Sequence, residues 1–262
     1  MYLQRFMNYL EYFLFSHHKR GHGLHSPFVF KLVSEHFRNK IDPGVVKRIE
    51  FIRNSNISDK RLISVRDLGA GSLKMKGNIR KVSEIARYSP VPRKYGMLLS
   101  NLASGFGGSS IIEMGTSLGI STMYLASGAP ESMVYTIEGC PATASVAREN
   151  FLSSGIENIR LLTGSFEDHL PELIGAGIKP GLVFIDGNHR NDPVLSYFRQ
   201  VVDISGPDTL VILDDIHISE EMDRAWEEIK RNENVTITID IFRMGLVFFR
   251  KGIARFNYVI RY

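Results

Sequence analysis

The sequence of 262 residues has only one cysteine, Cys140, so it cannot form an intramolecular disulfide. A chain without disulfides suits a reducing compartment, and we predict a cytoplasmic location. Internal repeats and low-complexity tracts are also lacking, as is any long run of Lys and Arg. The net charge of +4 therefore permits an acidic substrate or a nucleic acid as partner without requiring either.

The sequence also lacks an apolar run long enough to cross a membrane. Residues 1–15 are apolar overall, but Arg5 and Glu11 interrupt them, and no cleavage site of small residues follows. The basic cluster from His17 to Arg20 comes after this stretch and not along one face of it. We therefore expect an amphipathic helix that packs on the protein, and no membrane partner.

The pattern of apolar residues changes near residue 92. Residues 1–92 are expected to form helices and loops, with helical spacing in 1–15 and 28–37. Residues 93–262 alternate short apolar strands with helical stretches, which predicts a parallel sheet covered by helices on both faces. The strands are expected at 110–114, 133–138, 159–162, 181–186 and 209–214, and the helices at 119–127, 141–153, 167–175, 192–203 and 219–232.

Two further strands, 235–241 and 244–250, are separated only by Phe242 and Arg243. So short a link permits an antiparallel hairpin but not a parallel return, which needs a crossover of about a dozen residues or more. The predicted fold class is α/β. It is a Rossmann-like, doubly wound and mostly parallel sheet of seven strands with an antiparallel last strand, preceded by a helical extension over residues 1–92.

Ligands of a doubly wound sheet bind at the carboxyl ends of its strands. The first predicted strand of this sheet ends in a turn with two glycines, which permit a close approach by a ligand but also occur in ordinary strand-to-helix turns. Glu113 before the turn can accept from an ammonium group, and Glu138 after the second strand can accept both hydroxyls of a ribose. The candidate cofactor residues here are Glu113, Gly115, Thr116, Ser117, Gly119, Glu138 and Gly139.

Two features favour S-adenosylmethionine over a nicotinamide cofactor, although both molecules contain a ribose. The glycine turn lacks the G-x-G-x-x-G spacing that seats a pyrophosphate on a helix N-terminus. The terminal hairpin also departs from the usual dinucleotide-binding sheet.

Several segments carry a resemblance to a known family. IIEMGTSLGISTMYLA resembles motif I of the class I S-adenosylmethionine-dependent methyltransferases, most closely that of the catechol O-methyltransferase-like, metal-dependent branch. TIEGCPATASVARENFLSSGIENI resembles the second motif and LLTGSFEDHLPEL the third segment, and LVFIDGNH and LVILDDIH resemble the fourth and fifth strands. The resemblance covers about residues 92–250. It implies that Glu138 binds the ribose, that Ser165 and Phe166 border the adenine and that Asp186 lies at the cofactor.

Two other loops have sequences that could suggest a cofactor or a metal site, but other roles are favoured for both. Residues 67–71, DLGAG, could pass for a motif I, but no second strand ending in an acid follows at the right distance, so a substrate-side loop or plain turn is favoured. Residues 17–25 hold four histidines whose spacing fits no common zinc pattern. A loop that lines the substrate cleft is favoured there.

Acidic residues follow the fourth and fifth strands, and the candidate metal ligands are Asp186, Asp214 and Asp215. Carboxylates that converge at one edge repel each other unless a positive group lies between them. Mg²⁺ or another divalent cation with oxygen ligands would provide that charge. The resemblance implies the same, because metal-dependent O-methyltransferases place acidic or amide ligands at these positions. Helix N-capping is the alternative role for these residues.

The proton of an acceptor hydroxyl needs a base, and His189, three residues after Asp186, is the first candidate. It lies where the catechol-type enzymes have a catalytic Lys, so the match is in position and not in residue type. His217 is the second candidate, and a surface or supporting histidine is the alternative for each. The predicted catalytic residues are His189 and Asp186.

Together these features predict an S-adenosylmethionine-dependent methyltransferase that O-methylates a small hydroxylated acceptor with metal assistance. A methyltransferase acting on tRNA or another macromolecule, an NAD(P)-binding oxidoreductase and a cofactor-binding protein without catalysis are the alternatives. The N-terminal region is expected to serve as a lid, a substrate-side wall or a dimerisation element, by analogy. A homodimer is possible from the sequence, and nucleic acid is the less favoured partner.

Overall fold

The structure, a computed structural model, describes residues 9–10, 12–14, 16, 26–66 and 77–262. The loop with four histidines, the turn at 67–71 and most of the stretch 1–15 lie outside the described residues. Of that stretch, residues 9, 10 and 12–14 are helical, in agreement with the predicted helix. No helix within the described ranges is long and apolar enough to cross a membrane.

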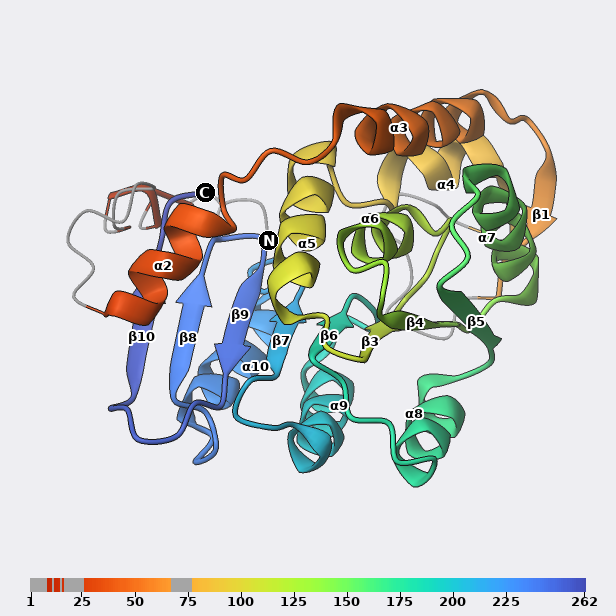
Figure 1. The fold of residues 1–262 in the computed structure, drawn as a ribbon. Coiled ribbons are helices and arrows are strands. Elements are labelled where there is room, and N and C mark those ends of the chain that lie inside the picture. Colours follow the sequence, from red (N-terminus) through yellow and green to blue (C-terminus); the bar gives the residue numbers. More distant parts are fainter. Residues whose placement is uncertain (1–8, 11, 15, 17–25, 67–76) are drawn as a thin grey trace.

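The centre of the molecule is an eight-stranded sheet with the order β10-β8-β9-β7-β6-β3-β4-β5 (Figure 1). Its strands are β3 Ser110–Met114, β4 Met133–Glu138, β5 Ile159–Thr163, β6 Leu182–Ile185, β7 Leu210–Leu213, β8 Ile237–Asp240, β9 Gly245–Phe248 and β10 Phe256–Val259. Strand β9 pairs antiparallel with both of its neighbours, β7 and β8, whereas all other pairs are parallel. The predicted α/β class with a mostly parallel sheet is therefore confirmed.

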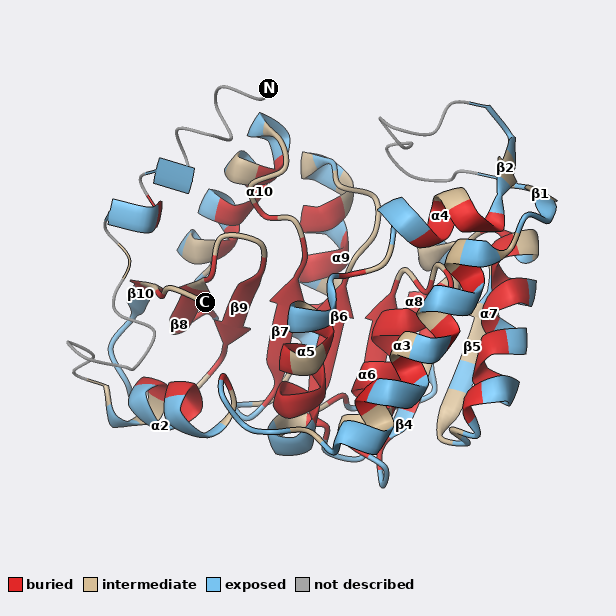
Figure 2. Ribbon diagram, turned by 90° about the horizontal axis from the view of Figure 1, so that it is seen from above, coloured by how far each residue is buried: buried red, intermediate tan, exposed pale blue. Residues whose placement is uncertain are grey.

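Helices cover both faces of the sheet, as the alternating pattern predicted. Helices α5 Arg93–Phe106, α6 Ile120–Gly128 and α7 Pro141–Ser154 lie on one face, and α8 Phe166–Gly175, α9 Asn191–Ile204 and α10 Glu220–Arg231 lie on the other (Figure 1). In β6, Leu182 and Phe184 face the first layer, and Val183 and Ile185 face the second. The central strands are buried on both sides, which explains why they are apolar without interruption (Figure 2).

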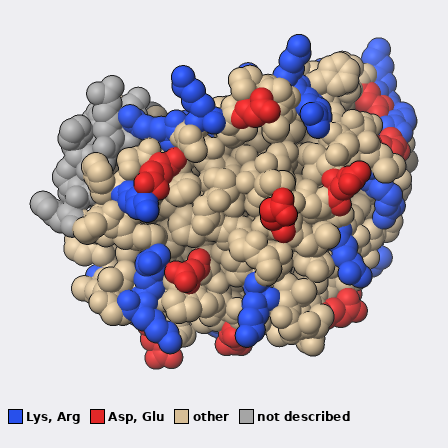
Figure 3. Space-filling model, viewed as in Figure 1, with Lys and Arg blue, Asp and Glu red and all other residues tan. Residues whose placement is uncertain are grey.

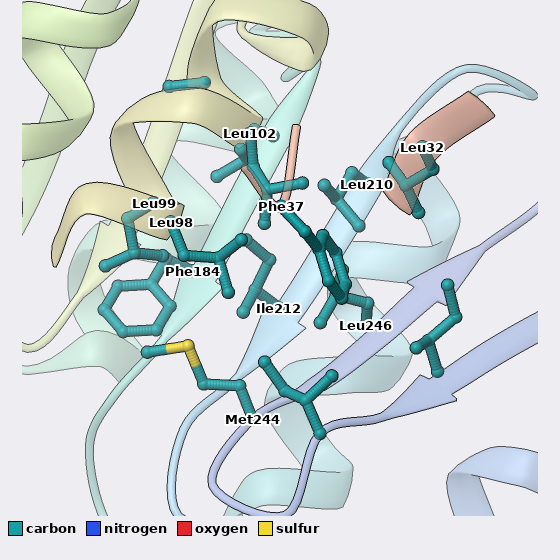
Figure 4. Close-up of a cluster of buried hydrophobic side chains, with 14 of the residues drawn as sticks. Leu32, Phe37, Leu98, Leu99, Leu102, Phe184, Leu210, Ile212, Met244 and Leu246 are labelled. Carbon is teal, nitrogen blue, oxygen red and sulfur yellow. The ribbon is translucent and has the colours of Figure 1, made fainter. Parts of the chain in front are cut away.

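The N-terminal elements extend the first helical layer. They are α2 Pro27–Glu35, α3 Pro43–Ser58, a small antiparallel pair of β1 Leu62–Ser64 and β2 Ile79–Lys81, and α4 Val82–Tyr88. Helix α3 packs on α6 and α7 through Val46 and Ile49, and α2 packs over the sheet through Leu32. Figure 4 shows Leu32 and Phe37 meeting side chains of α5 and of the central strands in one cluster.

The β1–β2 pair corrects the expectation of helices and loops alone in residues 1–92, and the central sheet has one further strand that was not predicted. Strand β10 pairs in parallel with β8 at the edge of the sheet, so the antiparallel strand β9 is not the last one. Tyr258 and Ile260 of this segment enter the core, and the Tyr12 hydroxyl donates to the Ile260 carbonyl at 2.9 Å. The carboxyl-terminal segment therefore ties the N-terminal helical residues to the edge of the sheet.

Candidate functional site

The turn after β3 packs against the neighbouring strands at the carboxyl edge of the sheet. Gly115 has a φ of 109°, and a Cβ on it would lie 2.1 Å from the carbonyl oxygen of Asp186. The backbone N–H groups of Gly115 and Thr116 both donate to the carbonyl of Ile137, at 3.1 and 3.2 Å. The turn then runs to Gly119, which precedes α6. A glycine is required at 115 because the backbones after β3 and β6 nearly touch there.

Glu138 links this turn to the next one. Its Oε2 accepts from the backbone N–H of Ser117 at 2.8 Å, and its Oε1 accepts from that of Cys140 at 2.9 Å. Ser117 itself has a φ of 48°, a left-handed conformation that directs its N–H toward β4. Gly139 lies between Glu138 and α7. The carboxylate predicted to bind a ribose is therefore fixed at the end of β4, directly beside the glycine turn.

Glu113 lies deeper than the sequence analysis assumed. It is fully buried, and the hydroxyls of Thr122 and Thr136 donate to its Oε2. The Thr136 hydroxyl is also 2.6 Å from that of Thr116 in the glycine turn. Glu113 therefore supports the turn from beneath α6, through a chain of hydroxyls. Its contact with a cofactor ammonium group stays a prediction.

Burial raises the pKa of Glu113 to about 7, since the hydroxyl donors only partly offset the loss of water. The folded protein thus keeps a proton that the unfolded chain releases near pH 4.5, and stability falls as the pH rises through the interval up to about 7. The wild type should therefore lose roughly 3 kcal/mol of stability as the pH rises from 5 to 8, and Glu113→Gln, which has no carboxyl group at this site, should not show this loss. Urea denaturation at both pH values measures the difference. Glu131→Gln, at an exposed site, should differ from wild type in unfolding free energy by the same small amount at both pH values. If the difference between Glu113→Gln and wild type were also the same at both pH values, the raised pKa of Glu113 would be contradicted.

The residues predicted to border an adenine follow β5. Ser165 is the N-cap of α8: its hydroxyl accepts from the N–H of Asp168 at 3.2 Å. The Phe166 ring lies against Gly187, where an added Cβ would come within 2.6 Å of it. The ring also packs edge to face on Tyr197, with centroids 5.4 Å apart. Phe166 thus stands beside the turn that follows Asp186, and its role at an adenine stays a prediction.

The acidic trio meets a positive group, and that group is an arginine. Nε and Nη2 of Arg243 donate to the two carboxylate oxygens of Asp214 at 3.0 and 2.6 Å, and Nη2 lies 3.7 Å from Asp215. The Asp214 side chain is fully buried, whereas Asp186 and Asp215 are exposed by 17% and 14%. Among the described residues, no group of three or more His, Cys, Asp or Glu could hold a metal ion.

The hairpin between β8 and β9 delivers Arg243 to this edge. Because β9 runs antiparallel to β7, Gly245 at its start pairs with Leu213 at the end of β7. Phe242 has a φ of 69°, and its N–H donates to Oδ1 of Asp240 at 2.7 Å. In the sequence, Phe242 and Arg243 stand out only as the short link of the predicted hairpin. The position of Arg243 could have been predicted from the sequence. The turn of the predicted hairpin lies at the carboxyl edge of the sheet, where the acidic residues follow their strands.

The two candidate bases have different surroundings. Nε2 of His189 lies 3.6 Å from Oδ1 of Asp186, and its side chain is 28% exposed. Nδ1 of His217 is 2.5 Å from Asp223, and its Nε2 is 2.8 Å from Asp240. Burial lowers the pKa of His217, but these two carboxylates outweigh it and raise the pKa to about 9. His217 is thus charged at neutral pH and cannot take a proton, which leaves His189 as the candidate.

A large pocket lies away from these candidate site residues. It has a volume of about 610 Å³ and is lined by residues that precede β3, β6 and β7, including Gly108, Gly181 and Thr209. This is the amino edge of the parallel strands, opposite the edge where ligands of such sheets bind. The glycine turn, Glu138 and the acidic trio do not line it.

Comparison with known proteins finds methyltransferases of similar sequence and fold. Residues 112–216 match a family described as a methyltransferase domain. A catechol O-methyltransferase of Niastella koreensis is 32% identical over 49% of this chain and 57% of its own length, and one of Mycobacterium tuberculosis is 31% identical over 48% and 56%. The chain thus spans little more than half the length of these relatives. An O-methyltransferase from Bacillus cereus, solved in complex with SAH, is similar with a TM-score of 0.57 and 20% identity over 84% of this chain and 97% of that one.

Residues 112–216 thus match a methyltransferase domain, and these matches confirm the resemblance to class I methyltransferases that the motifs indicated. The relatives named above include catechol O-methyltransferases, and the solved O-methyltransferase shares the fold.

Proposed function

We propose that the protein transfers a methyl group from S-adenosylmethionine to a hydroxyl group of a small acceptor. The observation that carries the proposal is the contact of Ser117 with Glu138, which sets a ribose-type acceptor beside the glycine turn. The Gly115 turn in addition touches the Asp186 backbone, so the cofactor residues and the acidic trio share one edge. The names of the catechol O-methyltransferases above support a hydroxyl acceptor.

Each of these residues has a separate role in the proposed reaction. S-adenosylmethionine, when bound, supplies a methyl group on a positively charged sulfur. Glu138 would accept from the ribose hydroxyls, and Phe166 would border the adenine. His189 takes the proton of the acceptor hydroxyl, and Asp186 orients the imidazole from 3.6 Å. Fixed positions of cofactor and acceptor provide most of the remaining acceleration.

A divalent cation does not fit the residues present at the acidic trio. Both carboxylate oxygens of Asp214 already accept hydrogen bonds from Arg243, and the guanidinium adds a positive charge at the place where a cation would sit. The proposal therefore routes no step through magnesium. The cytoplasmic location, a homodimer and the division at residue 92 stay predictions.

The alternatives from other classes have less support. A macromolecular substrate such as tRNA would favour a continuous basic face, whereas Lys and Arg alternate with Asp and Glu on the face in Figure 3. A nicotinamide cofactor would favour the spacing that the glycine turn lacks. A cofactor-binding protein without catalysis would leave the contact of His189 with Asp186 without a purpose.

Calorimetric titration with S-adenosylhomocysteine tests the proposal, with NADH as the competing ligand. We expect a dissociation constant in the micromolar range for S-adenosylhomocysteine and no heat of binding for NADH, because Glu138 lies beside a turn without a pyrophosphate seat. Binding of NADH alone would support the oxidoreductase. Binding of neither ligand would contradict the methyltransferase.

A further inference from the structure

We propose that Arg243 takes the place of a divalent cation at the acceptor side of this site, so that methyl transfer proceeds without a metal. The inference rests on the proposed function for the identity of the reaction, but its claim about metal binding stands on geometry alone. It reverses the expectation drawn from the acidic trio.

The guanidinium supplies a positive charge next to the trio. Asp214 is fully buried, and a buried carboxylate needs a positive partner or several donors. Arg243 supplies both, with two parallel hydrogen bonds of 3.0 and 2.6 Å to the two oxygens of Asp214. The same Nη2 lies 3.7 Å from Asp215. A divalent cation would have to displace the guanidinium from Asp214 and would be repelled by its charge.

The hairpin holds Arg243 in this position. Nε2 of His217 lies 2.8 Å from Oδ2 of Asp240, and Oδ1 of Asp240 accepts from the N–H of Phe242 at 2.7 Å. The carbonyl of Arg243 accepts from the N–H of Ile216 at 3.2 Å, which ties the turn to the segment after Asp215. With its backbone fixed on both sides, the side chain is oriented in advance toward Asp214.

Part of the guanidinium remains available to an acceptor. Nε and Nη2 are used on Asp214, while Nη1 donates no hydrogen bond to any described residue, and the side chain is 21% exposed. The Tyr95 ring lies 5.7 Å from the guanidinium carbon and forms a neighbouring wall. Nη1 carries two N–H donors, so it can donate to a hydroxyl or anionic oxygen of an acceptor, whereas a metal binds acceptor oxygens by chelation. The site therefore favours acceptors whose oxygens accept hydrogen bonds from Nη1 and need no chelating metal.

Titration of the full chain with Mn²⁺, followed by the electron paramagnetic resonance of the free ion, tests the inference without an identified acceptor. We expect the wild type to bind Mn²⁺ only in the millimolar range. Arg243→Ala, which leaves the three carboxylates without their cation, should bind one ion at least tenfold more tightly. Arg199→Ala removes an exposed arginine from an ion pair with Glu228 and should behave like the wild type.

Micromolar binding of one Mn²⁺ by the wild type would overturn the inference, as would an unchanged affinity in the Arg243 variant. Arg243→Gln provides a second neutral variant if the alanine variant fails to fold, and a native melting transition qualifies either one. Titration with S-adenosylhomocysteine in the same samples separates the two proposals. A wild type that binds neither this ligand nor Mn²⁺ contradicts the methyltransferase, while tighter Mn²⁺ binding by the Arg243 variant would still show that Arg243 excludes the metal.

Discussion

Replacing Glu138 by alanine is expected to weaken the binding of S-adenosylhomocysteine by a factor of about 100 or more. Hydrogen bonds from the two ribose hydroxyls to a carboxylate contribute about 1.5–3 kcal/mol each, and a factor of 100 corresponds to about 2.7 kcal/mol. The substitution also removes the acceptor for the N–H groups of Ser117 and Cys140, so the glycine turn loses its link to β4. Both effects act in the same direction on the dissociation constant, which calorimetry measures.

Glu131→Ala is the matched control for this prediction. Glu131 is exposed and precedes β4, so it lies toward the opposite end of the strand that Glu138 ends. Its removal changes the net charge by the same amount but leaves the carboxyl edge intact. An affinity that falls equally in both variants would trace the effect to net charge and would contradict the assigned contact with the ribose.

Most of the sheet could be predicted because its strands are buried on both faces. Five apolar segments separated by helical stretches gave β3 to β7 within one or two residues of their bounds. Strand β10 carries no such signal, because only Tyr258 of its four residues is buried. It is recruited by pairing with β8, a long-range contact that local apolar periodicity does not encode.

The sequence predicted where the candidate site residues lie in the fold, but it did not predict which of their side chains interact. Strand ends are visible in the sequence, so it predicts Glu138, Asp186 and Asp214 at the carboxyl edge, where the structure has them, while their roles stay predictions. The pairing of Arg243 with Asp214 joins residues 29 positions apart and follows from the register of β9 on β7. The inward direction of Glu113 could have been inferred from strand alternation, because Glu113 shares the face of Ile111 toward the helical layer.

Gly115→Ala is expected to lower the free energy of unfolding by about 3 kcal/mol or more and to abolish detectable binding of S-adenosylhomocysteine. The left-handed backbone alone costs an alanine about 1–2 kcal/mol. The added Cβ would in addition lie 2.1 Å from the carbonyl oxygen of Asp186, so one of the two turns has to move. Because those turns carry Asp186 and predicted cofactor residues, stability and binding are expected to be lost together.

Gly177→Ala separates the two causes. Gly177 also has a positive φ, 74°, but an added Cβ would meet nothing within 4 Å. Urea denaturation should therefore show a loss of about 1 kcal/mol for this variant and unchanged ligand affinity. Equal losses in the two variants would mean that backbone conformation alone makes glycine necessary at 115. A larger loss at 115 that coincides with lost binding would locate the requirement in the close approach of the turns after β3 and β6, where the predicted cofactor residues meet Asp186.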